Sequence, residues 1–137
     1  MKVILIIFAL YFTMLTTFAS SRQYAEKVYQ EQWCNAHGGA MEVILPDKAR
    51  IDCLTSTHAI EFDFANKWGE SIGQSLYYSA ATNKKAGIVL IMENGIKDPK
   101  YLERINIVAK KYNITVWTMT PYDLKKKGTC LAGNDAI

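Results

Sequence analysis

The stretch that decides the fold is Arg50-Ile51-Asp52-Cys53-Leu54-Thr55-Ser56-Thr57-His58-Ala59-Ile60-Glu61-Phe62-Asp63-Phe64. Charged and apolar residues alternate in both halves, as in strands whose successive side chains point to opposite faces. The apolar face would carry Ile51, Cys53, Ile60, Phe62 and Phe64, and the polar face Arg50, Asp52, Glu61 and Asp63. With Thr55 to His58 as the turn, the sequence predicts a β-hairpin in which Asp52 lies opposite Glu61 and Arg50 lies opposite Asp63.

Two opposed carboxylates in such a hairpin have β-carbons about 5 Å apart and repel each other unless a positive charge lies between them. A divalent cation would remove this repulsion, and carboxylate oxygens are ligands that magnesium prefers. The hairpin therefore predicts a metal site for Mg²⁺ or Mn²⁺, with Asp52 and Glu61 as its ligands. A second interpretation is that Arg50 and Asp63 form an ordinary cross-strand ion pair.

The chain has 137 residues, enough for one domain with a modest core. Lys2 is followed by an uncharged, mostly apolar run from Val3 to Ala19, which predicts a signal peptide at residues 1–19 that is cut near Ala19. The alternative is an uncleaved membrane anchor, because the run approaches the length of a spanning helix. We expect a domain at residues 20–120 and a flexible tail at residues 121–137. The mature protein would be periplasmic or secreted, without stable membrane association.

The three cysteines form an odd set in an exported chain, where thiols oxidise. Cys34 closes the first expected helix, and Cys53 lies on the apolar face of the hairpin. Cys130 lies in a glycine-containing tail, where we expect it to have no fixed neighbour. We therefore expect a disulfide between Cys34 and Cys53. The cysteines and histidines lack the spacing of a zinc site.

The remaining segments predict an α/β protein. Helices are expected at residues 21–34, 67–81 and 99–112, and strands at residues 40–45, 87–92 and 113–119. The run at residues 87–92 is apolar throughout, which is typical of a strand buried on both faces. Two glycines in the second helix suggest close approach to the sheet. The order predicts a mixed sheet, antiparallel at first and parallel where the helical crossovers begin.

The second helix carries Gln74 and Tyr78 four residues apart, on one helical face. With Asp52 on one strand and Glu61 and Asp63 on the next, the chain resembles the PD-(D/E)xK nuclease superfamily, and its helix resembles the glutamine-x-x-x-tyrosine motif of the RecB-type branch. The chain also resembles a group of small exported bacterial proteins that carry the pattern DCLT, HAIEFDFA, KWGE, IGQ and LYY. The first resemblance implies a restriction-endonuclease-like three-layer sandwich with a central mixed β-sheet.

The same resemblance implies roles for the site residues. Asp52 and Glu61 would bind magnesium, and Gln74 and Tyr78 would hold substrate beside it. The sequence departs from the family pattern at Asp63, where the family has a lysine that orients or deprotonates the attacking water. Lys67, at the start of the helix, is the nearest ammonium and would take the catalytic role together with Asp52, Glu61 and Asp63.

The expected function is therefore an exported, metal-dependent nuclease that hydrolyses phosphodiester bonds in DNA or RNA. The alternative is a catalytically inactive protein of the same fold that binds a protein or nucleic-acid partner, since Asp63 replaces the lysine. Another interpretation of Gln74 and Tyr78 is that they hydrogen-bond a strand end. The lysine pairs and the triplet at residues 125–127 could follow a phosphate backbone, or they could be a solvated face.

Overall fold

The computed structural model describes residues 22–125. The elements are α1 (Glu26–Ala36), β1 (Ala40–Ile44), β2 (Arg50–Leu54), β3 (His58–Phe64), the 3₁₀ turn η1 (Ala65–Lys67), α2 (Trp68–Thr82), β4 (Lys85–Ile91), α3 (Pro99–Tyr112), β5 (Thr115–Met119) and α4 (Pro121–Lys125). The expected signal peptide and Cys130 lie outside the described residues. The expected tail begins as a helix, because residues 121–125 form α4.

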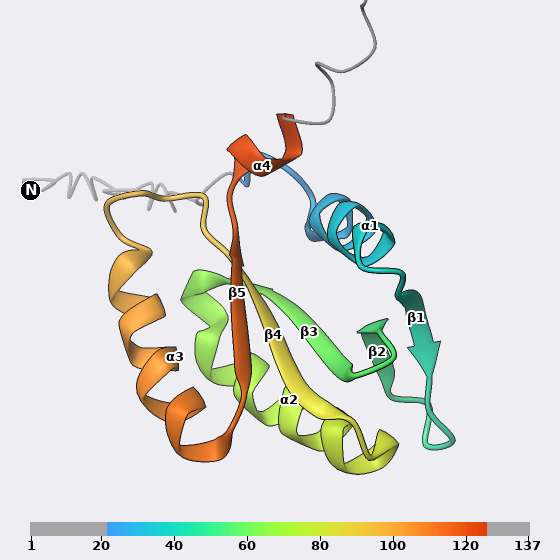
Figure 1. Cartoon of the computed structure of the whole chain (residues 1–137). Coiled ribbons are helices and arrows are strands. Elements are labelled where there is room, and N and C mark those ends of the chain that lie inside the picture. Colours follow the sequence, from blue (N-terminus) through green and yellow to red (C-terminus); the bar gives the residue numbers. More distant parts are fainter. Residues whose placement is uncertain (1–21, 126–137) are drawn as a thin grey trace, which may run out of the picture.

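The five strands form one sheet in the order β1-β2-β3-β4-β5. The first three are antiparallel neighbours, and β3, β4 and β5 run parallel, as the sequence predicted. Helix α1 packs on one face through a cluster that includes Tyr29 and Trp33, and α2 and α3 pack on the other face around Ile88 and Leu90 (Figure 1). The result is a mixed α/β fold in which the sheet lies between helical layers.

The helix boundaries follow local chemistry. Pro99 is the first residue of α3, a position at which a backbone N–H would have no hydrogen-bond partner within the helix. Helices α2 and α3 end at Asn83 and Asn113, each with φ of 54°, a left-handed conformation that asparagine tolerates better than most residues. His37 closes α1, and its Nδ1 lies 2.7 Å from the backbone oxygen of Trp33 in the last turn. Among residues 22–125 the structure contains no helix with the length and apolar character to span a membrane.

The expected face assignment of β2 is wrong in part, and β1 departs from regular alternation at the same place. Met41 and Cys53 pack with the α1 side of the sheet, whereas Val43 and Ile51 pack with Tyr78 of α2. In a regular strand, residues i and i+2 lie on the same face. Here Met41 and Val43 lie on opposite faces of the sheet, and so do Cys53 and Ile51. The cause is Glu42, whose φ of 56° interrupts the pleat of β1 at the position opposite Asp52.

A disulfide joins Cys34 at the end of α1 to Cys53 of β2, with sulfur atoms 2.03 Å apart, which confirms the expected pairing. Gly39 makes room for it, because a β-carbon there would lie 2.5 Å from the Cys53 Sγ and 2.7 Å from the Cys34 Sγ. Gly38 turns the chain with φ of 63°, a conformation that glycine adopts without strain. The disulfide at this corner ties the end of α1 to β2 of the hairpin.

The two glycines of α2 do not approach the sheet. A β-carbon at Gly69 or Gly73 would meet nothing within 4 Å, and both residues are exposed. The side chains of α2 that pack toward α3 and the sheet are those of Trp68, Ile72 and Leu76. The expected reason for the glycines is therefore wrong, and packing within the described chain does not explain them.

Candidate functional site

The β2–β3 hairpin is paired near its turn and open beyond it. The pairs are Leu54 with Ala59 and Cys53 with Ile60, the register the sequence predicted. Beyond them, the Phe62 N–H donates to Asp52 Oδ2 at 2.8 Å, where a continued ladder would offer a backbone carbonyl of β2. The Asp52 carboxylate thus takes the place of a strand partner and lies at the fork between the two strands.

A cleft of about 370 Å³ opens at this fork. All six residues predicted for the site line it, so the structure brings them together in one cleft. They are Asp52, Glu61, Asp63, Lys67, Gln74 and Tyr78. The lining is completed by Glu26, Arg50, Phe62 and Glu70, so five carboxylates share one cleft with two cations.

Glu61 is the least satisfied group in the cleft. Its side chain is 5% exposed, and its Oε2 atom is buried without a hydrogen-bond partner. Burial, followed by the negative charges of Asp52 and Asp63, raises the pKa of Glu61 well above its usual range. A buried carboxylate oxygen without a donor is costly, so a proton or a cation at this position would stabilise the fold.

Asp52 lies beside Glu61 and is 6% exposed. Burial raises the pKa of Asp52, and the hydrogen bonds from the Phe62 backbone and from Glu61 offset part of that effect. The two acids therefore form a coupled pair that favours holding a proton while no cation is bound. The pair lies where β2 and β3 separate.

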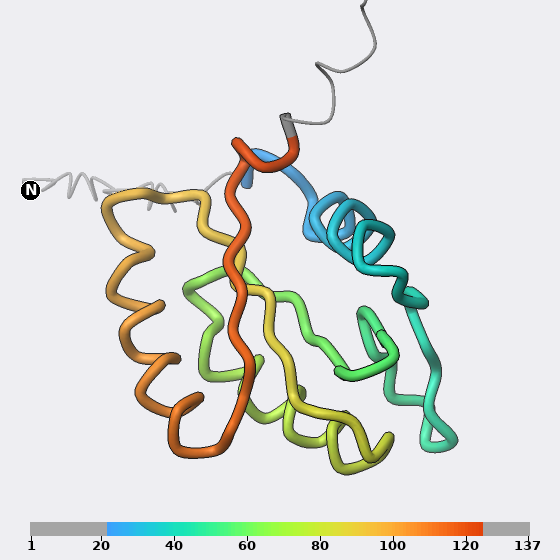
Figure 2. Tube along the Cα trace, viewed as in Figure 1, coloured from blue at the N-terminus to red at the C-terminus, as the bar shows by residue number. Residues whose placement is uncertain are grey.

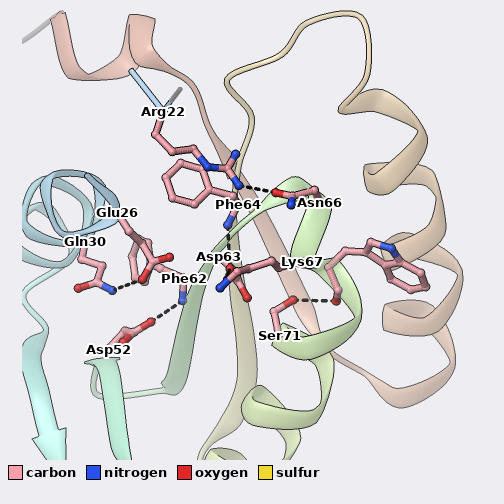
Figure 3. Close-up of polar contacts among 11 residues, drawn as sticks. Arg22, Glu26, Gln30, Asp52, Phe62, Asp63, Phe64, Asn66, Lys67 and Ser71 are labelled. Atoms are coloured by element: carbon pink, nitrogen blue, oxygen red, sulfur yellow. Dashed lines mark hydrogen bonds and ion pairs between the residues drawn. The ribbon is translucent and has the colours of Figure 1, made fainter. Parts of the chain in front are cut away.

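Asp63 and Lys67 form the second pair of the cleft. Asp63 is 4% exposed, accepts the Phe64 N–H at 3.0 Å, and lies 3.8 Å from the Lys67 Nζ. Burial raises the pKa of Asp63 to about 6, against the opposing effect of the Lys67 charge. Lys67 thus lies over the cleft beside the acids, as Figure 3 shows.

The expected contact between Arg50 and Asp63 is not formed. Arg50 donates instead to Glu42 of β1, with Nη1 and Oε2 2.8 Å apart. The reason is the opening of the hairpin, because the β2–β3 pairing ends before it reaches Arg50. The cross-strand ion pair with Asp63 is therefore absent, and Lys67 takes Arg50's place beside this acid.

The sequence reasoning missed Glu26 and Gln30. Both lie on α1, which brings Glu26 to the cleft from the opposite side to α2 (Figure 3). Gln30, which is buried, donates from Nε2 to Glu26 Oε1 at 3.1 Å. Burial, followed by the charges of Asp52 and Asp63, raises the pKa of Glu26 to about 7. No local pattern marks Glu26, since its place depends on the docking of α1.

Gln74 and Tyr78 lie on the α2 wall of the cleft. Burial raises the pKa of Tyr78, and a hydrogen bond with Gln74 offsets part of this rise. Tyr78 is buried against Ile51 and Ala59, whereas Gln74 is exposed. Gln74 is therefore accessible to a ligand from solvent, while Tyr78 also has a packing role.

The donor set fits a hard cation in part. Asp52 and Glu61 supply carboxylate oxygens, including the unpartnered Oε2 of Glu61. Within residues 22–125 no three His, Cys, Asp or Glu side chains converge closely enough to enclose a metal ion by themselves. A cation held by this pair would keep several waters, which suits magnesium better than ions that need a full protein cage.

Comparison with known proteins gives one informative relative. Over 104 residues the chain is 33% identical to a protein of Acanthamoeba polyphaga mimivirus that is named as KilA-N domain-containing. The match covers 76% of this chain but 41% of the relative, so the chain spans less than half of the relative's length. No family model matches the chain, and no solved structure matches it.

These findings overturn the expected family. The relative belongs to a giant virus, whereas the pattern was assigned to a bacterial group, and nothing in the comparisons supports the PD-(D/E)xK superfamily. The resemblance rested on few residues, namely two acids and a Gln–Tyr pair at helical spacing. Short sets of this kind arise in unrelated folds, and Asp63 already departed from the pattern.

Proposed function

We propose that the protein is a metal-dependent nuclease that hydrolyses phosphodiester bonds in DNA or RNA. The observation that carries this proposal is the buried Asp52–Glu61 pair in the lining of an open, acidic cleft, in which Glu61 Oε2 has no hydrogen-bond partner. Phosphodiester hydrolysis needs positive charge beside the phosphate and an activated water. A carboxylate pair in a cleft open to solvent can bind a divalent cation, which supplies the positive charge and activates a bound water.

In this proposal Asp52 and Glu61 hold Mg²⁺ or Mn²⁺, which when bound stabilises charge on the phosphate and lowers the pKa of water. The Phe62 N–H fixes Asp52 Oδ2 at 2.8 Å, so one ligand is oriented before a cation arrives. Such preorganisation reduces the reorganisation needed during the reaction. The finer fold expectation, a restriction-endonuclease-like sandwich, stays a prediction.

The other cleft residues have distinct proposed roles. Lys67, held 3.8 Å from Asp63, contacts a phosphate oxygen as a point charge. Glu26, whose pKa is about 7 because of burial and the nearby acids, accepts or returns a proton at neutral pH. Gln74, exposed on the α2 wall, hydrogen-bonds the substrate. Tyr78 supports Gln74 from its buried position.

A second candidate function is binding without catalysis. The observation in its favour is the Asp63–Lys67 ion pair, because an ammonium that is already paired is a weaker partner for phosphate. In this case the protein would bind a nucleic acid or a protein through the cleft. The disulfide supports passage through an oxidising compartment, which makes secretion part of either proposal.

The test is cleavage by the purified protein of plasmid, linear duplex and single-stranded DNA, and of RNA, with Mg²⁺ or Mn²⁺ against EDTA. The proposal expects metal-dependent cleavage that Glu61→Gln abolishes and that Glu31→Gln, an exposed acid on α1, leaves intact. Binding of these substrates without cleavage would favour the second candidate. Neither binding nor cleavage by the parent would reject both.

A further inference from the structure

Helix α3 carries a line of exposed cations that the site does not use. Lys100, Arg104 and Lys111 are four and seven residues apart, which places them in one stripe along the helix. The stripe lies opposite the packed side of α3, where Ile105 and Ala109 are buried. We name it the α3 stripe.

The α3 stripe has no acidic partner among the described residues. The ion pairs of residues 22–125 are Lys27 with Glu31, Arg50 with Glu42, and Lys67 with Asp63. Lys100 and Arg104 instead approach the ring of Tyr101, at 4.8 and 5.8 Å, and Lys111 lies 5.7 Å from the ring of Tyr112. Cations that rest on rings are partly ordered while their charge stays available.

Between the α3 stripe and the cleft, helix α2 exposes two glycines, Gly69 and Gly73. Around α2, Trp68, Ile72 and Leu76 face the α3 side, and Glu70 and Gln74 face the cleft. Gly69 and Gly73 occupy the ridge between them, facing away from the sheet. Glycine weakens a helix interior relative to alanine, and no contact within the described chain requires it here.

The order across this face is therefore acidic cleft, bare helix ridge, basic stripe. Helices α2 and α3 pack side by side on the same face of the sheet (Figures 1 and 2). Helix α3 also contacts η1, which carries Lys67. A polyanion crossing α2 would meet cations on α3 and reach Lys67 at the cleft. Without side chains at residues 69 and 73, its backbone could approach α2 closely.

We propose that the α2–α3 face, formed by the glycine ridge and the α3 stripe, binds the phosphate backbone of a nucleic acid and leads it into the cleft. The path into the cleft rests on the proposed function, whereas binding of the phosphate backbone does not require catalysis. From Lys100 to Lys111 the stripe spans about 16 Å, or about five phosphate rises along one strand of B-form DNA. Its charge and length thus fit a phosphate backbone.

The proposal is tested by binding of a fluorescein-labelled 30-base-pair duplex and a 30-nucleotide single strand, in DNA and RNA forms, in EDTA and over a salt series. Arg104→Ala should weaken binding and lower the slope of log affinity against log salt by about 1. Lys27→Ala, which removes one cation from the opposite face of the sheet, should leave both unchanged. The triple variant Lys100→Ala, Arg104→Ala, Lys111→Ala should lose most binding.

A second variant tests the ridge. Gly73→Gln adds a neutral, helix-favouring side chain in open space, so the melting temperature should not fall. It should nevertheless weaken binding, a result that a role in folding alone would not produce. Unchanged binding in Gly73→Gln removes the ridge from the proposal. Equal losses in Arg104→Ala and Lys27→Ala, or binding to phosphatidylserine vesicles but not to nucleic acid, overturn the whole inference.

The outcome separates this inference from the proposed nuclease. If the protein binds nucleic acid in EDTA through Arg104 but cleaves nothing with Mg²⁺ or Mn²⁺, the binding role of the α2–α3 face is supported and the nuclease proposal is rejected. The opposite result is also possible. If Glu61→Gln abolishes cleavage of bis(p-nitrophenyl) phosphate but Arg104→Ala leaves nucleic-acid binding unchanged, the nuclease proposal is supported and the binding role of the α2–α3 face is rejected.

Discussion

The cleft at the β2–β3 fork and the α3 stripe both carry an excess of one charge, but the two excesses have different energetic consequences. In the cleft Asp52, Glu61 and Asp63 are at most 6% exposed, so burial raises their pKa values, and repulsion from neighbouring acids adds to the rise. On α3 the cations lie in water, where like charges interact weakly. A proton or cation in the cleft therefore stabilises the fold, whereas the stripe adds little to stability and its proposed effect is on binding.

The largest expected effect is on catalysis at the cleft. Metal-assisted charge stabilisation is worth several kcal/mol, and each 1.36 kcal/mol is a factor of ten, so Glu61→Gln should lower kcat/KM by about 10²- to 10³-fold. Rates on bis(p-nitrophenyl) phosphate measure this. Glu31→Gln is the matched control, since it also removes one acid. Equal rates in the two variants would contradict the role of Glu61.

The next effect concerns the disulfide that holds the α1 wall of the cleft, for which the α3 side has no equivalent. The double variant Cys34→Ser, Cys53→Ser removes this cross-link, which should lower the free energy of unfolding by about 3 kcal/mol in the chain-entropy model. Urea unfolding should show a loss near this size. Peptide mapping without reductant should find Cys34 joined to Cys53, and a link from either one to Cys130 would disprove the pairing.

A smaller effect is the response of the metal-free protein to pH. Glu26 has an ordinary pKa of 4.5 that rises to about 7, and Asp63 has one of 3.8 that rises to about 6, in both cases mainly through burial. The folded state therefore binds more protons than the unfolded state between about pH 4 and pH 7, and stability should fall as pH rises through that range.

Unfolding in EDTA at several pH values measures this dependence. Glu26→Gln should flatten the upper part of the fall, because it removes the group with a pKa of about 7. A free energy of unfolding that increases from pH 4 to pH 7 would contradict the raised pKa values of Glu26 and Asp63.

The smallest effect is on the α3 stripe. Arg104→Ala should change the free energy of unfolding by no more than about 0.5 kcal/mol, because an exposed cation without an acidic partner adds little to stability. Glu61→Gln in EDTA should instead leave the protein as stable or more stable, since it removes a buried repulsion. Thermal melts of both variants sharpen the contrast between the two regions.

Much of this arrangement could be predicted from sequence because it depends on local periodicity. Alternation fixed the Asp52–Glu61 register, helical spacing placed Gln74 and Tyr78 together, and the order of elements implied the mixed sheet. The Cys34–Cys53 pairing followed from where the two cysteines lay in these elements.

The errors arose where structure depends on long-range contacts or unusual backbone. Glu26 reaches the cleft only because α1 docks across the sheet, and no spacing within α1 reveals this. The change of faces in β1 and β2 depends on a positive φ at Glu42, a conformation that glutamate rarely adopts. Arg50 turned to Glu42 because the hairpin opens before reaching Asp63.

The central claim, that Asp52 and Glu61 bind a divalent cation, is tested most directly by thermal unfolding at neutral pH with millimolar Mg²⁺ or Mn²⁺ against EDTA. Cation binding at a hundredfold excess over Kd stabilises by about 2.7 kcal/mol, which corresponds to an increase in Tm of roughly 10 °C or more for a domain of about 100 residues. The parent should show such an increase, and Asp52→Asn and Glu61→Gln should show little or none. A parent Tm that does not move, or one that moves equally in all three proteins, would contradict the claim.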